Sequence, residues 1–474
     1  MLTKHSRIRR SLKEDLGTLN LTTEEFVALL GRCAPTTFSA WGHDFDAIVK
    51  KGDLSAEGVL PSGGTPLFEY EEHHMLGDAL ELPGWDTADS TGKDKSAKIN
   101  PLTLPNKLQL SYGQINALAG DFYGTWQPIA TGKDLQEQMT FFEAAFNTLA
   151  RGPREKVDAL LKILQRETNA VQEAKQADPP KSVKQVYDEI GTSMLVDLIK
   201  ASKIGSTGPS YSDLLENNID HFAPDSVTAY NAGHAKALET AANAKSEQDL
   251  SLAYAMNAFA DHFLEDHFAS GHLRVPRAFM MDIMPKNICT NFMHNEDNTN
   301  GLNVLDSNKK AWHCYGDEML LDPSGRDTMQ QCLNALRQSV QEVWDAYKNG
   351  KNKKVIGPKE FKAWQFAPVA STAGNIAPMF KIGPKNEILQ RTGLDRLKDD
   401  PYNWKDYESV VGSKFTWLNT KKTDVNAYVY WSLLAYKRAP NNYYRNIIRE
   451  KLNEKMKDWH FPQLAIDLVN SMIG

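Results

Sequence analysis

The sequence lacks several features that would place it in a common class. Its 474 residues contain no apolar run of the roughly 18 residues that a membrane-spanning helix needs. The four cysteines form no Cys-x-x-Cys pair, so a zinc site built from thiolates is not expected. No internal repeat is present. The sequence therefore predicts neither a transmembrane anchor, nor a thiolate zinc module, nor a repeat array.

The first 16 residues are rich in Lys and Arg but have no apolar stretch of the kind that a secretory signal peptide needs. Three explanations remain open: the protein is made without such a peptide, the numbered chain begins after it, or export uses another route. We expect a protein that is secreted or delivered outside the producing cell without a Sec signal peptide. A cytoplasmic location is the alternative.

The charge balance is slightly acidic. The chain has 54 Lys and Arg against 60 Asp and Glu, which gives a formal net charge of −6. A protein that binds nucleic acid through a broad surface usually has a basic face. We therefore expect no nucleic-acid partner.

Helical periodicity dominates the sequence. It is clearest over residues 133–178, 182–202, 230–244, 250–260 and 325–347. The pattern predicts a mostly α-helical fold. We divide the chain into an N-terminal segment (1–65), a helical domain that holds most of the histidines (66–348) and an aromatic-rich C-terminal domain or lid (349–474).

The stretch from His262 to His272 contains the residues that point most directly to a function. His262 and Asp266 are four residues apart, so on a helix both side chains project from one face, one turn apart. An imidazole and a carboxylate at this spacing can share a zinc ion. Ser270 and Gly271 then offer a helix break, which lets His272 return to the same region.

Histidines are concentrated in one part of the sequence. Of the 12 in the chain, more than half lie in a single stretch: His221, His234, His262, His267, His272, His294 and His313. Buried histidines need partners, and exposed ones have no reason to cluster. Because cysteine ligands are absent from this pattern, it indicates catalytic rather than structural zinc.

This stretch resembles the signature of the zinc-dependent phospholipase C and P1-type nuclease superfamily. That signature reads His, aromatic, two residues, Asp, three residues, Pro, one residue, His. The residues in register are His262, Phe263, Asp266 and His272. Ser270 replaces the usual Pro and Glu265 replaces a usual small residue, but neither change removes a ligand. The resemblance is to the bacterial phospholipase C branch, covers roughly residues 66–320 and implies a helical core with two or three zinc ions.

The resemblance also implies how the remaining ligands are distributed. Asp220 and His234 are separated like the Asp and His that join the central pair at the first zinc, and His221 stands beside them. Asp121 lies in a Gly-Asp-Phe-Tyr-Gly segment that is similar to one in the bacterial branch. We expect Asp121 to be an ion ligand and the general base, with Asp220 as the alternative base.

The second and third zinc positions are less complete. The resemblance gives His272 and His294 to the second zinc, with an acidic residue four positions after His294. That position holds Asn298, so we assign Asp297, with Glu296 and Asp317 as alternatives.

At the third zinc, relatives often use an N-terminal Trp, whereas Trp41 is internal. One of the pair His73 and His74 can replace it, and we assign His74. Arg274 and Arg277 are either phosphate contacts or surface residues, and we favour the latter.

By this resemblance the protein is a zinc-dependent phospholipase C. Asp266 would bridge two zinc ions, which polarise the phosphoryl oxygens and lower the pKa of a bound water to about 7. The expected partner is a phospholipid at a membrane surface, with phosphatidylcholine as the substrate and diacylglycerol and phosphocholine as the products. Two alternatives stay open: a P1-type single-strand nuclease, and a non-catalytic helical interaction protein that zinc only stabilises.

Overall fold

A computed structural model describes the chain in part. The described residues are 70–85, 101–183, 200–280, 288–350 and 355–391, with a few gaps, and scattered residues of 186–198 and 407–470. The N-terminal segment 1–65, and with it Trp41, lies outside them. The chain divides into a core unit (64–278 and 296–371) and a second unit (1–63, 279–295 and 372–474). The predicted boundary at residue 348 falls inside the core unit.

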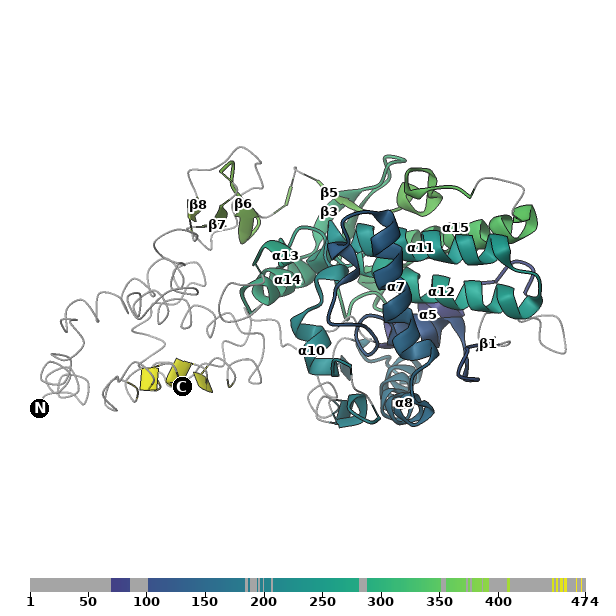
Figure 1. Cartoon of the computed structure of the whole chain (residues 1–474). Helices are drawn as coiled ribbons and strands as arrows, with labels where there is room; N and C mark the ends of the chain where they lie inside the picture. Colours follow the sequence, from purple (N-terminus) through teal and green to yellow (C-terminus); the bar gives the residue numbers. More distant parts are fainter. Residues whose placement is uncertain are drawn as a thin grey trace, which may run out of the picture. The chain divides into compact units, whose positions relative to one another are not determined.

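The described part of the chain is mostly helical, as the periodicity predicts (Figure 1). The α-helices are α5 (Tyr70–Asp78), α6 (Tyr112–Leu118), α7 (Leu135–Ala150), α8 (Arg154–Gln176), α10 (Tyr211–Glu216), α11 (Asp225–Asn243), α12 (Glu247–Asp266), α13 (Arg277–Met280), α14 (Ile288–Asn300) and α15 (Arg326–Asn349). Short 3-10 helices are η3 (Ile129–Thr131), η4 (Ile219–His221), η5 (Ser270–His272), η6 (Pro323–Gly325), η8 (Pro358–Glu360) and η9 (Lys362–Gln365).

The strands are short and antiparallel. In the core unit β1 (Leu102–Thr103) pairs with β2 (Gln109–Leu110), and β3 (Leu302–Leu305) lies between β4 (Ala311–Cys314) and β5 (Val369–Ala370). The second unit has its own sheet of β6 (Phe380–Ile382), β7 (Ile388–Arg391) and β8 (Tyr407–Ser409). None of these strands carries a predicted site residue.

Helix α12 is the central helix of the core unit. Ser246 caps its first turn in a capping box with Asp249, which satisfies backbone N–H groups that have no partner within the helix. From Ala253 to Asp266 every residue of α12 is buried. A helix that is buried on all sides must be covered by neighbours on all sides, so its polar residues near Asp266 meet other protein groups rather than solvent.

Helices α11 and α15 supply part of that cover, and α7 adds aromatic side chains (Figure 1). The short link 244–246 makes α11 and α12 antiparallel neighbours, and they form the most extensive helix–helix contact among the described elements. Gly233 allows this close packing, because a Cβ there would lie 2.6 Å from the Cβ of Ala260. Phe142 of α7 packs edge-on against Phe259.

A second close contact brings α5 and α6 together beside α12. A Cβ on Gly77 would lie 2.5 Å from the Cα of Gly113, so two glycines let the backbones meet. The Gly113 N–H also donates to Asp78 Oδ1 at 3.0 Å. Both helices contact α12. The pair therefore fixes which side chains of α5 face α12.

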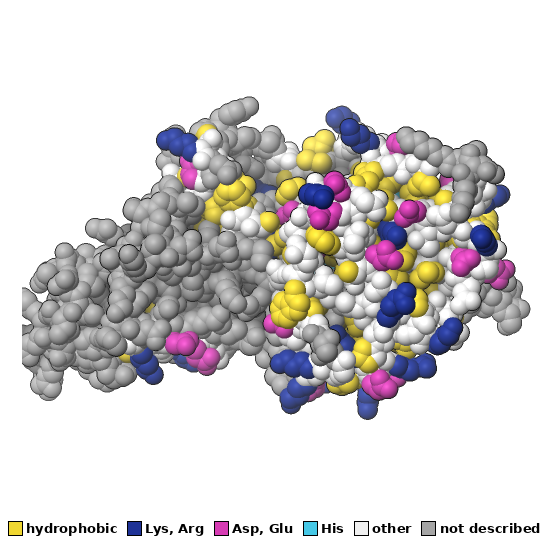
Figure 2. Space-filling model, in the orientation of Figure 1, with side chains coloured by type: hydrophobic (Ala, Val, Ile, Leu, Met, Phe, Trp, Pro, Cys, Tyr) yellow, Lys and Arg dark blue, Asp and Glu magenta, His cyan; other side chains and the backbone are white. Residues whose placement is uncertain are grey.

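No helix in the described ranges combines the length and the apolar character needed to cross a membrane. On the face of the core unit in Figure 2, Lys and Arg side chains alternate with Asp and Glu rather than forming one broad basic field. This distribution agrees with the small net charge of the sequence.

Candidate metal centre

The carboxylate of Asp266, at the end of α12, lies between four imidazoles. Its Oδ2 is 2.8 Å from His221 Nδ1 and 3.4 Å from His262 Nε2. Its Oδ1 is 3.7 Å from His73 Nε2 and 3.6 Å from His272 Nδ1. All five side chains are buried. Both oxygens of one carboxylate therefore face nitrogen atoms that come from separate elements.

Two sets of residues in the core unit place three ligand atoms within 4.8 Å of one another. The Asp121 group is Asp121, His221 and His262, and the His73 group is His73, His262 and Asp266. They share His262 and meet at Asp266. Buried imidazoles and carboxylates that converge in this way are a donor set that can hold a metal ion.

The protonation states of the histidines in these groups suit the binding of a metal cation. Burial lowers the pKa of His73 and His262 well below the usual histidine value, and the neighbouring histidines lower both further. Burial also lowers the pKa of His221. These histidines are therefore neutral at pH 7, and a neutral imidazole is the form that binds zinc.

Gly120 gives the ligand atoms room. Its φ is +67°, a conformation that favours glycine. A Cβ at this position would lie 2.6 Å from His262 Nε2 and 2.8 Å from His221 Cε1. The glycine of the Gly-Asp-Phe-Tyr-Gly segment thus keeps the backbone close to the two histidines without filling the space between them.

Asp121 follows directly and lies close to His221 and His262, while its role as an ion ligand stays a prediction. It comes from the turn after α6, where its backbone N–H donates to the carbonyl of Ala119. Burial raises the pKa of its carboxyl group to about 7, His221 lowers it in part, and Asp266 raises it. Asp121 thus lies within the electrostatic reach of both His221 and the central carboxylate.

Asp220 is adjacent to His221 but binds backbone N–H groups instead of facing the other ligand atoms. Its carboxylate accepts hydrogen bonds from the N–H groups of Ile129 at 2.7 Å and Ala130 at 2.9 Å. Burial raises its pKa to about 6, although these two bonds lower it in part. The structure does not bring Asp220 into either group. It ties η4 to η3 and so positions His221.

His234 is also kept away from the centre. On α11 its Nδ1 is 2.6 Å from Asn257 Oδ1 and its Nε2 is 3.0 Å from Glu342 Oε2. Both ring nitrogens are used within the protein, so the spacing from Asp220 to His234 does not mark a ligand pair. The partner that occupies Nε2 lies on α15, more than a hundred residues further along the chain.

On α5 the structure selects His73 rather than the predicted His74. His74 contacts two carboxylates of its own helix, Glu71 and Asp78, each at 3.1 Å. Burial lowers its pKa, but hydrogen bonds to Asp78 and Glu71 outweigh this and raise it to about 9. His73 precedes it and projects about 100° away around the helix, toward His262 and Asp266. His74 is therefore not part of the described cluster.

Asp317, rather than the assigned Asp297, is the carboxylate next to His272. Asp297 accepts two hydrogen bonds from Arg274, each at 2.8 Å. Asp317 Oδ2 lies 3.7 Å from His272 Nε2. Asn298, at the position where an acidic residue was expected, donates to Asp317 Oδ2 at 2.9 Å. Asn298 thus helps to position Asp317, which lies next to His272 where the acidic residue was expected.

The loop that carries Asp317 is held by a residue that the sequence argument missed. Glu72 accepts hydrogen bonds from the backbone N–H groups of Glu318 at 3.1 Å and Leu320 at 2.8 Å. Burial raises its pKa well above the usual value. The only sequence signal was the acidic pair Glu71–Glu72 before the histidines. Helix α5 therefore supplies His73 to the centre and, through Glu72, holds the loop that carries Asp317.

The two arginines after the signature are used within the protein. Arg274 pairs with Asp297, as described, and Arg277 donates to the carbonyl of Leu215 at 3.0 Å and also to Asn218. Arg277 is buried and packs over the ring of Phe222, so it is not the surface residue that we favoured. His294 is a buried residue of the second unit, and its role as a ligand stays a prediction.

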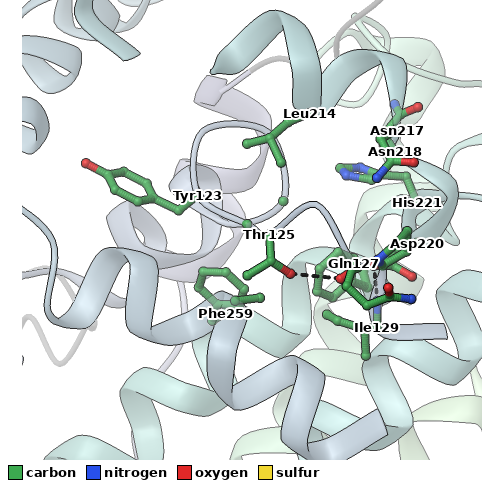
Figure 3. Close-up of a pocket in the computed structure, with 15 residues that line it drawn as sticks. Tyr123, Thr125, Gln127, Ile129, Leu214, Asn217, Asn218, Asp220, His221 and Phe259 are labelled. Atoms are coloured by element: carbon green, nitrogen blue, oxygen red, sulfur yellow. Dashed lines mark hydrogen bonds between the residues drawn. The ribbon is translucent and has the colours of Figure 1, made fainter. Parts of the chain in front are cut away.

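A small pocket with a mixed polar and apolar lining reaches the Asp121 group (Figure 3). It is lined by Gly120 and His221 on the side of the cluster, and by Thr125, Gln127 and Asn218 among others. Its volume of about 30 Å³ exceeds the roughly 10–15 Å³ that one water molecule needs. The pocket therefore connects His221 to space that a water can fill.

The fold and this centre define a mostly helical protein with buried His and Asp groups that can hold metal ions. The chain matches no protein-family model, no curated protein and no solved structure. The sequence from His262 to His272 and the geometry around Asp266 are the two observations that bear on its function.

Proposed function

We propose that this protein is a zinc-dependent phospholipase C that hydrolyses the glycerol-side phosphodiester of glycerophospholipids such as phosphatidylcholine. The observation that carries the proposal is the position of Asp266, with each carboxylate oxygen facing two imidazoles. A carboxylate placed in this way suits two metal ions at once, and paired ions suit phosphodiester hydrolysis. The signature from His262 to His272 supports the same assignment.

The residues divide into proposed roles. His221 and His262 would hold one ion, His73 a second, and His272 with Asp317 a third, with Asp266 shared. Zinc, when bound, supplies a Lewis acid for phosphoryl oxygens and a source of hydroxide at neutral pH. His294 stays a proposed further ligand, as the resemblance implies.

Asp121 is the proposed general base, since it lies among the ligands and comes from the turn that Gly120 opens. Asp220 is set aside as the alternative base, because two backbone N–H groups occupy its carboxylate. A base must reach the proton that it removes, and of the two carboxylates only Asp121 belongs to a ligand group.

A single-strand nuclease is the second candidate function. Trp126 is 60% exposed and lies between Thr125 and Gln127, two residues of the pocket wall. An exposed indole stacks on unpaired bases, and it also suits a lipid interface. The mixed surface charge in Figure 2 favours the lipid.

The test is phosphocholine release from phosphatidylcholine vesicles, with zinc, with a chelator and with Asp266→Asn. We expect release that needs zinc and falls by more than about 100-fold in the variant, because a direct ligand matters more than a supporting residue. Asp261→Asn is the matched control, since Asp261 is a buried carboxylate of the same helix that contacts Tyr112 and Ser339 instead.

Absence of release by a zinc-loaded wild type would refute the lipid substrate. Cleavage of single-stranded DNA by the same preparation would then support the nuclease. A protein that binds zinc but cleaves neither substrate, and unfolds when zinc is removed, would support the non-catalytic alternative.

A further inference from the structure

We propose that Glu265 is a positioning residue that makes His73 a metal ligand through Nε2. The inference rests on the proposed metal centre and deepens it. Glu265 precedes Asp266 on α12 and stands where the resembled signature usually has a small residue. A large acidic side chain at a buried position of a metal-binding helix needs a physical reason, and its contacts supply one.

The carboxylate of Glu265 is held between two neighbouring helices. Its Oε1 accepts a hydrogen bond from Asn116 Nδ2 of α6 at 2.8 Å, and its Oε2 lies 2.5 Å from His73 Nδ1 of α5. All three side chains are fully buried. Because α6 fixes one oxygen, the other is presented to His73 at a fixed place.

This contact decides which nitrogen of His73 faces the centre. With Nδ1 hydrogen-bonded to Glu265, Nε2 lies 3.7 Å from Asp266 Oδ1. Nε2 can bind a metal only when Nδ1 carries the ring proton and donates it to Glu265, so the contact acts by keeping the proton on Nδ1. An imidazole whose second nitrogen bonds a carboxylate is a common arrangement for metal-bound histidine, since the bond fixes both tautomer and ring orientation.

Packing limits the ring in the remaining direction. His73 stacks on His262, with ring centroids 4.2 Å apart and planes 29° from parallel. The contact between Gly77 and Gly113 sets the distance of α5 from its neighbours. The backbone thus places the His73 ring, and Glu265 sets its rotation.

The test measures zinc affinity by competition with a chelating dye, and also Co²⁺ absorption, for full-length variants. We expect Glu265→Leu to weaken the affinity for one ion by about 10- to 100-fold, the usual cost of losing a supporting partner. Glu265→Gln keeps an acceptor for His73, so it should weaken that affinity by less than about tenfold and shift the Co²⁺ spectrum. Asp261→Asn should leave both unchanged.

A double variant separates positioning from general damage. If Glu265 acts through His73, Glu265→Leu adds no further loss to His73→Ala. An affinity within about twofold of wild type in Glu265→Leu, or losses that simply add, would overturn the inference. Should Glu265→Leu not fold, the comparison of Glu265→Gln with Asp261→Asn decides, and identical spectra would overturn it.

The failure of this inference can be told from failure of the proposed function. Zinc affinity is measured without substrate, so a wild type that binds zinc but releases no phosphocholine refutes the phospholipase alone. A wild type that binds no zinc refutes both.

Discussion

Two buried regions of histidine and carboxylate meet on α12, about one turn apart, and they differ in how their polar atoms are arranged. In the candidate metal centre, around Asp266, most of the facing nitrogen and oxygen atoms are 3.4 to 3.7 Å apart. The closed network is made of Tyr112, His234, Asn257, Asp261, Ser339 and Glu342. There the neighbouring atoms are mainly 2.6 to 3.0 Å apart.

The distances distinguish a hydrogen-bonded network that stabilises the core from a candidate metal site, although both consist of histidines and carboxylates. In the closed network both oxygens of Asp261 accept hydrogen bonds from Tyr112 and Ser339, and both nitrogens of His234 have partners. Such satisfied groups stabilise a core. Around Asp266 most of the ligand atoms converge at separations longer than usual hydrogen bonds, with His221 Nδ1 at 2.8 Å as the exception. A buried histidine is therefore a candidate ligand only where other donors converge on it.

The largest contrast is expected between His262→Ala and His234→Ala. His262→Ala removes the nitrogen shared by the Asp121 and His73 groups, so at least one zinc ion per chain should be lost. His234→Ala should keep the zinc but lower the free energy of unfolding by about 1–3 kcal/mol, because it leaves Asn257 and Glu342 without their partner. Elemental analysis measures the zinc content, and denaturant unfolding measures the free energy of unfolding. Zinc loss in His234→Ala would contradict the comparison.

A smaller effect on zinc should follow from Gly120→Ala. The added methyl group would displace His262 and His221, so we expect zinc affinity to fall by about 10- to 100-fold, as for a misplaced ligand. The control is Gly350→Ala, which also has a positive φ but nothing within 4 Å of its Cβ. It should cost stability of about 1–3 kcal/mol through backbone strain alone. Equal zinc affinities in the two variants would refute the close approach at Gly120.

The smallest contrast concerns two carboxylates near His272. Asp317→Asn should weaken the binding of one zinc ion by at least about tenfold. Asp297→Asn should leave zinc binding unchanged and lower stability by about 1–3 kcal/mol, because it weakens the hydrogen bonds from Arg274. Titration of each variant with zinc distinguishes them. The reverse pattern would restore Asp297 as the ligand.

The mostly helical fold and the core of the site could be predicted from the sequence because they are local. Helical periodicity is visible in the residues themselves, and the spacing of His262 and Asp266 puts both on one helix face. The break at Ser270 and Gly271 likewise predicted the return of His272, which lies 3.6 Å from Asp266.

The rest depends on contacts between distant segments. Selection of His73 over His74 follows from how α5 packs against α6 and α12, which no residue of α5 reveals. Asp317 is placed through Glu72, about 250 residues earlier in the chain. His234 is occupied by Glu342 of α15. Spacing along the chain cannot reveal partners that only the tertiary fold brings together.

The most direct test of the account is diffraction at the zinc absorption edge from crystals of the zinc-loaded protein. The account predicts anomalous peaks on both sides of the Asp266 carboxylate, one beside His221 and His262 and one beside His73, and none between His234 and Glu342. A peak in the closed network, or no peak beside Asp266, would contradict it.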